Sequence, residues 1–194
     1  THKKYGEATA VLAGNSLLTL AFEIISCKKN SLSKNQKNEI ISLLSSCAGH
    51  TGIAGGQELD LKFENKKKKL NQIIEMQRKK TGKLFSFCIQ SAAIVGNKNN
   101  NEKIKFGKMG EDIGLLFQLA DDFLDLKGSK KLVGKSIKKD KKKGKSTLIN
   151  LLGYENALHY ADKLKKKILN KLKKHGKNAD NLIETIEFIK ERKF

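Results

Sequence analysis

Residues 113–125 read IGLLFQLADDFLD, and this stretch decides the fold. It lies in a longer apolar segment, Ile104 to Leu126, whose hydrophobic residues recur at the three- and four-residue spacing of a helix face. Asp121 and Asp125 are four residues apart, so on a helix they share one face. We therefore expect a strongly apolar helix that carries acidic groups near its C-terminal end.

Apolar segments on both sides of this stretch predict further helices. They cover Tyr5 to Ser26, about Lys37 to Cys47, Leu70 to Val95 with an interruption at Gly82, Glu155 to Lys173, and Ala179 to Lys190. Gly96 to Asn101 and Gly128 to Gly144 are expected loops, and Thr147 to Leu152 a short apolar turn. The glycine-rich stretch Ala48 to Leu61 is either a loop or a tightly packed helix. No strand pattern stands out, so residues 1–194 predict a single all-α domain.

The composition fits this class and limits the partners. The chain has 194 residues, no Pro, and a net charge of +20. A basic chain can bind nucleic acid or an anionic membrane surface, but aromatic residues are only 6% and Arg78 and Arg192 are the only arginines. We therefore interpret the charge as lysines on solvated helix faces and expect no nucleic-acid partner. We also expect no membrane span, because no apolar run approaches the needed length.

Cysteine usage points to a reducing compartment. The three cysteines are an odd number at wide spacing, which is typical neither of a disulfide framework nor of a zinc site. The sequence therefore favours a cytoplasmic location.

The acidic motif is the sharpest chemical signal. Like charges at Asp121 and Asp125 repel, and an unpaired carboxylate within an apolar helix is costly. A Mg²⁺ ion would relieve both effects, because it takes one or two carboxylates and completes its shell with water and phosphate oxygens. Asp121, Asp122 and Asp125 are thus candidate metal ligands. The alternative is an exposed acidic face or a helix end near lysine partners.

Lysines near glycines supply candidate diphosphate contacts. Lys135 and Lys145 lie in the Gly/Lys-rich segment after the acidic helix, where they could act as point charges for a diphosphate. A kink at Lys80-Thr81-Gly82 would turn Lys80 and Thr81 toward the bundle interior. The alternative for each lysine is a solvated surface charge.

Several short motifs occur together in one order. They are Thr1-His2-Lys3, the run Glu7 to Gly14, Gly55 to Leu61, Lys80-Thr81-Gly82, Phe117 to Asp125, Gly134-Lys135, and Gly144 to Thr147. In order and spacing they resemble the trans-isoprenyl diphosphate synthases, in particular the bacterial farnesyl diphosphate synthases, over essentially the whole chain.

This resemblance implies an isoprenoid-synthase-type helical bundle around a central cavity, usually a homodimer. It implies a Mg²⁺-dependent condensation of an allylic diphosphate (dimethylallyl or geranyl) with isopentenyl diphosphate to farnesyl diphosphate, with about three Mg²⁺ ions per site.

Residue roles follow from the same resemblance. Asp121, Asp122 and Asp125 match a metal-binding aspartate motif. Lys80, Lys135 and, more weakly, Lys145 match diphosphate contacts, whereas Thr81 and Gln118 match polar groups near a carbocation. Gln57 and Asp60 match supporting positions.

Two departures keep other functions open. The sequence begins just after the position of the family's first aspartate-rich motif, and Asn15-Ser16 stands where the family commonly has Asp-Ala. The alternatives are therefore a synthase of geranylgeranyl or longer chains, or a non-catalytic subunit or fragment that binds diphosphate without turnover.

Overall fold

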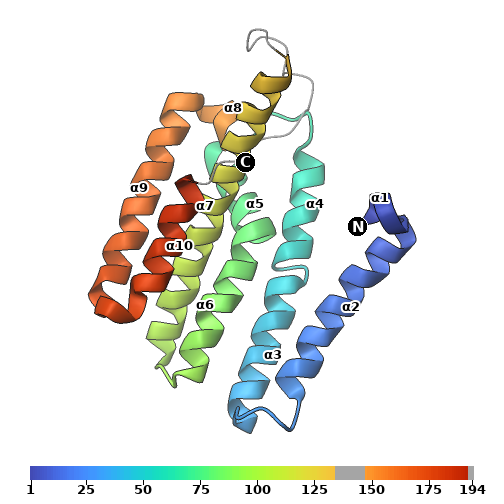
Figure 1. Cartoon of the computed structure of the whole chain (residues 1–194), viewed down its shortest axis with the longest axis vertical. Helices are drawn as coiled ribbons and strands as arrows, with labels where there is room; N and C mark the ends of the chain where they lie inside the picture. Colours follow the sequence, from blue (N-terminus) through green and yellow to red (C-terminus); the bar gives the residue numbers. More distant parts are fainter. Residues whose placement is uncertain (134–146, 192–194) are drawn as a thin grey trace.

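The computed structural model describes residues 1–133 and 147–191, and its helices run roughly parallel in a bundle (Figure 1). In chain order they are α1 (His2–Tyr5), α2 (Glu7–Ser26), α3 (Lys34–Ala48), α4 (Ile53–Phe63), α5 (Leu70–Gln77), the π-helix η1 (Arg78–Gly82), α6 (Lys83–Val95), α7 (Asn100–Val133), α8 (Leu148–Leu152), α9 (Tyr154–Leu172), the 3₁₀-helix η3 (Lys173–Ala179) and α10 (Asp180–Glu191). The described residues contain no strand, so the all-α prediction is confirmed.

The core gathers around α7, which lies between α6 and the pair α9 and α10 (Figure 1). Leu115, Leu116 and Leu119 are at most 1% exposed. Burying each such side chain contributes roughly 1.5–3 kcal/mol. Opposite them lie buried residues of α5, α9 and α10, namely Ile73, Met76, Ala161, Leu164, Ile168, Leu172, Ile186 and Ile189. The apolar stretch of the sequence is therefore the central helix of the bundle.

Helix α7 is longer than predicted. It continues through Gly128 to Val133, so the expected loop start at Gly128 is wrong. One glycine costs a helix only about 1 kcal/mol, and the lysines around it are good helix formers. A long helix already packed in the core extends through such a segment because each further residue adds a hydrogen bond without a new nucleus.

The glycine-rich stretch Ala48 to Leu61 contains both structures that its sequence allows, a turn over residues 49–52 and a tightly packed helix from Ile53. In α4, a Cβ built on Gly56 would lie 2.2 Å from the backbone nitrogen of Lys80. Only glycine allows α4 to approach η1 this closely.

The interruption predicted at Gly82 is a π-helix. The five residues of η1 connect α5 to α6 without a break in the helical path. Gly82 lies directly against α7, where a Cβ on Gly114 would be 2.6 Å from the Cα of Gly82. A wider turn and two facing glycines thus bring η1 onto α7.

Helix starts differ from the predicted ones for local reasons. The helix predicted from Tyr5 begins two residues later, at Glu7, because Gly6 takes a φ of 84° and separates α1 from α2. Helix α3 starts three residues earlier than expected, since Ser33 and Gln36 form a reciprocal capping box. The apolar turn after Thr147 is the short helix α8, whose first turn Thr147 caps by accepting a bond of 3.1 Å from the Asn150 nitrogen.

Helix α2 lies beside α3 at the edge of the bundle, and none of its residues is buried (Figure 1). An 18-residue window of this 20-residue helix has a mean hydropathy of 1.6, so by length and composition α2 could cross a membrane. The expectation that no run approaches a span therefore does not hold for α2. One such helix is weak support for a span, because buried core helices and signal sequences near an N-terminus pass the same test.

Candidate active site

The candidate active site centres on a chain of hydrogen bonds between η1 and α7. The Thr81 hydroxyl donates to Oε1 of Gln118 over 3.0 Å, and Nε2 of Gln118 donates to Oδ1 of Asp122 over 3.0 Å. From the end of α5, Nε2 of Gln77 approaches Oδ2 of Asp122 at 3.4 Å. These bonds join Thr81 and Gln118, predicted from the sequence, to the aspartate motif.

The π-helix determines which residue reaches α7. Its wider turn places the backbone of Gly82 against Gly114, and this contact brings the neighbouring Thr81 within reach of Gln118. Gln118 and Asp122 are four residues apart on α7, so their side chains meet on one helix face.

Asp122 is the most perturbed acid of the site. Burial raises its pKa to about 6, and the negative charges of Asp125 and Asp121 push in the same direction. The hydrogen bonds from Gln118 and Gln77 oppose this change but do not cancel it. A positive charge near the motif would therefore be favourable.

Lys80 and Asp60 form the second part of the site. The ammonium group of Lys80 donates to Oδ2 of Asp60, which links η1 to α4. Both side chains are partly buried, at 33% and 18% exposure. The close approach at Gly56 sets this pairing, whereas Gln57, one turn before Asp60, is exposed.

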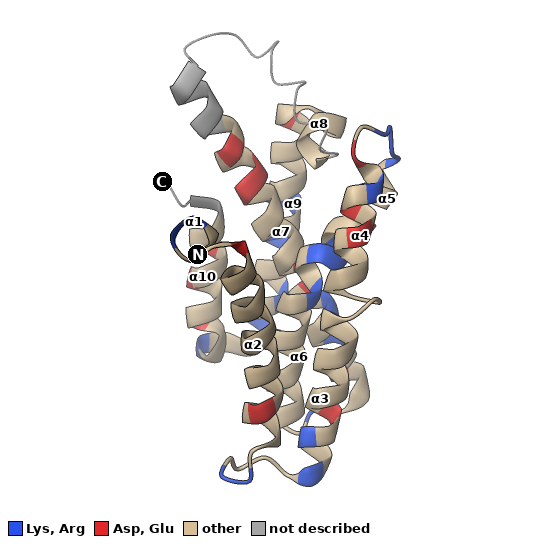
Figure 2. Ribbon diagram, turned by 90° about the vertical axis from the view of Figure 1, so that its right-hand side faces the viewer, with Lys and Arg blue, Asp and Glu red and all other residues tan. Residues whose placement is uncertain are grey.

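The other predicted metal ligands and diphosphate contacts lie near or beyond the C-terminal end of the described part of α7. Asp121 is partly exposed and Asp125 exposed, and acidic residues stand out near the C-terminal end of α7 (Figure 2). Lys135 and Lys145 lie outside the described residues.

The aspartates fit a hard divalent cation supplied with further oxygen ligands. Within the described ranges, no group of three or more His, Cys, Asp or Glu side chains is arranged to hold a metal by itself. Asp121 and Asp125 offer carboxylate oxygens from one helix face, and Mg²⁺ needs only one or two such groups beside water and phosphate. Burial is the main cause of the raised pKa of Asp122, and the negative charges of Asp125 and Asp121 add to it, so a cation would be favourable at this point.

Sequence reasoning missed three residues that build this region. Gln77 contacts Asp122, and Arg78 of η1 pairs with the buried Asp112 of α7 at 2.5 Å. A carboxylate among apolar neighbours signals a buried partner, so Asp112 could have been singled out. Its partner could not, because the sequence offers 40 basic residues.

A family model described as Polyprenyl synthetase matches residues 1–187. The chain belongs to the polyprenyl synthetase family. Among curated members of this family, it is 37% identical to the farnesyl diphosphate synthase of Micrococcus luteus over 191 residues, which is 98% of this chain and 65% of the relative. It is 33% identical to the chloroplastic geranylgeranyl pyrophosphate synthase of Catharanthus roseus, over 88% of this chain and 48% of the relative. The chain thus spans less than two thirds of these relatives.

Solved members of the polyprenyl synthetase family share the fold. An FPP/GFPP synthase from Zymomonas mobilis in its apo form matches with a TM-score of 0.82 at 35% identity, over 97% of this chain and 63% of that one. A geranyltransferase from Helicobacter pylori complexed with magnesium and isoprenyl diphosphate matches with a TM-score of 0.77 at 34% identity, over 97% and 61%. The predicted family and its all-α fold are therefore confirmed.

Proposed function

We propose that the protein is a Mg²⁺-dependent short-chain prenyltransferase that condenses isopentenyl diphosphate with dimethylallyl or geranyl diphosphate. The main support is the bonded chain Thr81–Gln118–Asp122, which lies beside Asp121 and Asp125 in a member of the polyprenyl synthetase family. A magnesium and isoprenyl diphosphate complex of the Helicobacter pylori relative supports the same chemistry.

Asp121 and Asp125 would hold Mg²⁺, with Asp122 between them on the buried side. About three ions per site is the expectation from the family resemblance, and bound Mg²⁺ supplies charge neutralisation of the leaving diphosphate. Lys80 supplies a further positive charge, which Asp60 holds in place. Lys135 and Lys145 are proposed diphosphate contacts, and Gln57 and Asp60 supporting residues.

The proposed reaction needs no protein base. The C–O bond of the allylic diphosphate breaks, and the bonding electrons leave with the diphosphate. The double bond of isopentenyl diphosphate attacks the resulting allylic cation, a C–C bond forms, and the proton lost afterwards goes to the diphosphate. The Thr81 and Gln118 oxygens would stabilise the cation as fixed dipoles.

Farnesyl diphosphate is the proposed product, because farnesyl diphosphate synthases are among the matched relatives. A geranylgeranyl product is the second candidate, since the Catharanthus roseus relative is named for it.

A prenyl-transfer assay on the natural full-length protein tests the function. With Mg²⁺, isopentenyl diphosphate and geranyl diphosphate, we expect a C15 product by mass spectrometry. Asp121→Asn should lower kcat/KM by at least about a hundredfold, because transition-state charge stabilisation is lost. Asp162→Asn on the exposed side of α9 is the matched control and should keep activity. Mg²⁺-dependent diphosphate binding without turnover would instead support the non-catalytic subunit.

We also propose a cytoplasmic homodimer in which α2 meets α2 of a second copy. Large apolar side chains line this helix, and Val11, Leu12, Leu17 and Ile24 are each at least 60% exposed. An apolar surface of this kind is typical of an interface.

A further inference from the structure

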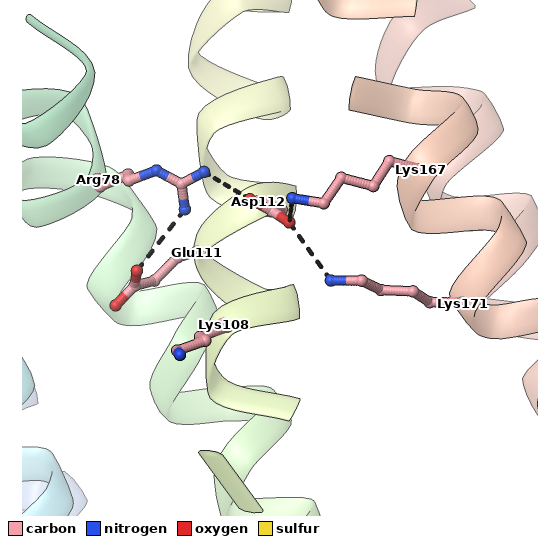
Figure 3. A pocket seen from close by; sticks show the side chains of 6 residues that line it. All are labelled: Arg78, Lys108, Glu111, Asp112, Lys167 and Lys171. Carbon is pink, nitrogen blue, oxygen red and sulfur yellow. Dashed lines mark hydrogen bonds and ion pairs between the residues drawn. The ribbon is translucent and has the colours of Figure 1, made fainter. Parts of the chain in front are cut away.

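A hollow lined by charged residues lies on another face of α7, away from the aspartate motif. It is a cavity of about 360 Å³ lined by Arg78, Lys108, Glu111, Asp112, Lys167 and Lys171 (Figure 3). These residues come from η1, α7 and α9. Asp112 precedes Gln118 by six residues, or about 240° around the helix, so the two face different sides. We call this hollow the lysine pocket.

Asp112 lies at the floor of the lysine pocket, and its single negative charge is paired with three cationic side chains. Oδ1 of Asp112 accepts from Arg78 at 2.5 Å, while its Oδ2 lies 2.9 Å from the Lys167 ammonium and 3.6 Å from that of Lys171. Burial alone would raise the pKa of Asp112, but the bonds from Arg78 and Lys167 outweigh it and hold the pKa below its ordinary value.

Positive charge therefore remains after pairing. Glu111, the other acid in the described part of the lining, is already shared between Arg78 at 3.6 Å and Lys83 at 2.6 Å. Lys108 is exposed and makes no ion pair within the described residues (Figure 3). The described lining thus carries three lysines and one arginine against two acids.

Two lysines of the pocket lie close enough together to bind one small anion. Lys167 and Lys171 are one turn apart on α9, and both ammonium groups lie near the same oxygen of Asp112. Their side chains stay 56% and 42% exposed, so each ammonium group has donors left for a ligand from solvent. Among the described residues, those that line the pocket are all charged, with no aromatic or aliphatic side chain.

We propose that the lysine pocket binds a free phosphate-class anion, inorganic diphosphate above all, on Lys108, Lys167 and Lys171. We choose diphosphate because the proposed prenyl transfer would release it, so this choice rests on the proposed function. The excess of positive charge in the pocket does not depend on that function. The group recognised is the oxyanion, which free diphosphate and the head of a prenyl diphosphate share.

Calorimetric titration of the natural full-length protein with diphosphate in excess EDTA tests the proposal. We expect saturable binding that Lys167→Gln/Lys171→Gln weakens by at least about tenfold. The matched control, Lys163→Gln/Lys166→Gln, removes the same charge from exposed positions of α9 outside the pocket and should change the affinity by less than about twofold. Equal weakening by both pairs, or no saturable binding, would overturn the proposal.

Further variants separate the pocket from the candidate active site and from folding defects. Asp121→Asn/Asp125→Asn should keep the Mg²⁺-free binding; its loss would assign the anion to the aspartate motif and overturn the pocket without touching the proposed function. Lys167→Arg/Lys171→Arg should keep binding, and its failure at an unchanged unfolding midpoint would contradict the charge argument. Geranyl diphosphate should bind no tighter than diphosphate, because tighter binding would mean that the hydrocarbon chain is recognised.

Discussion

Asp122 is the residue at which burial and negative charge act together. Its pKa of about 6 lies above the ordinary 3.8, so the folded state holds a proton that the unfolded chain releases at lower pH. Asp122 therefore adds stability below about pH 4 and loses this contribution as the pH rises through about 6.

This gives a measurable pH dependence. Between about pH 4 and 7, ionisation of Asp122 should cost up to about 3 kcal/mol of unfolding free energy. Asp122→Asn should remove this slope, and the two proteins can be compared by denaturant unfolding across the range. Mg²⁺ with diphosphate should also flatten the slope of the wild type, because the bound cation favours the ionised form. An identical slope in both proteins would contradict the raised pKa.

Thr81 offers a test of the hydrogen-bonded chain. Thr81→Val keeps the shape of the side chain but leaves Gln118 without the 3.0 Å donor. We expect kcat to fall about tenfold with little change in KM, because the oxygen dipole is needed at the transition state more than in the ground state. Thr185→Val on exposed α10 is the control. A change in KM alone would place Thr81 in substrate binding instead.

The sequence predicted which residues belong to the candidate active site, but it did not predict the hydrogen bonds between them. Thr81 and Gln118 were expected near the motif, and their bond brings them together. The helical spacing places Gln118 equally well beside Asp121 or Asp122, and only the packing of α7 against η1 selects Asp122. Gln77 escaped notice because no local pattern marks a buried amide.

Among the elements, α4 and η1 show how a glycine controls a contact. Helix propensity favours alanine over glycine, yet a Cβ at Gly56 would overlap the Lys80 backbone. The packing constraint therefore outweighs the propensity at this position.

Gly56→Ala should accordingly destabilise the protein by about 1–3 kcal/mol, in spite of its better propensity. Because α4 must move, Lys80 should lose Asp60, and Mg²⁺-dependent diphosphate binding at the candidate active site should weaken. Ala54→Gly, an exposed position of the same helix, costs only propensity, about 1 kcal/mol, and should leave diphosphate binding unchanged. Unfolding and binding titrations measure both effects. A stabilised Gly56→Ala protein would contradict the close approach.

Element types were more predictable than element ends. Periodicity located the amphipathic helices α9 and α10 because burial on one face repeats every turn. It could not place the end of α7, since no proline or second glycine follows Gly128 before Gly134. Periodicity also could not show whether the residues of α4 form a helix or a loop, because glycines occur both in turns and at close contacts between helices.

In the molecule as a whole, α2 is the helix whose apolar side chains remain exposed to solvent. Its exposed Val, Leu and Ile side chains contrast with the net charge of +20 that the chain carries. Burial of this face against a second copy would remove apolar area from water.

The dimer can be tested by sedimentation of the natural full-length protein. We expect a dimer that Leu17→Lys/Ile24→Lys converts to monomer, since these side chains are 67% and 60% exposed and lie two turns apart on one face of α2. Phe188→Lys, at a position 65% exposed on α10, should leave the dimer intact. Recovery of the wild type in the membrane fraction would contradict a cytoplasmic dimer.

The π-helix has a consequence for how this sequence can change. A π-turn holds one residue more than an α-helical turn, so η1 accommodates an extra residue while α5 and α6 keep nearly the phase of one continuous helix. Deletion of Lys79 would let this turn close to the α-helical width and would leave α6 facing α7 as before. The effect would be confined to η1, where the wide turn that brings Thr81 to Gln118 would be lost. A single-codon deletion could thus alter the site while the helices around it stay in place.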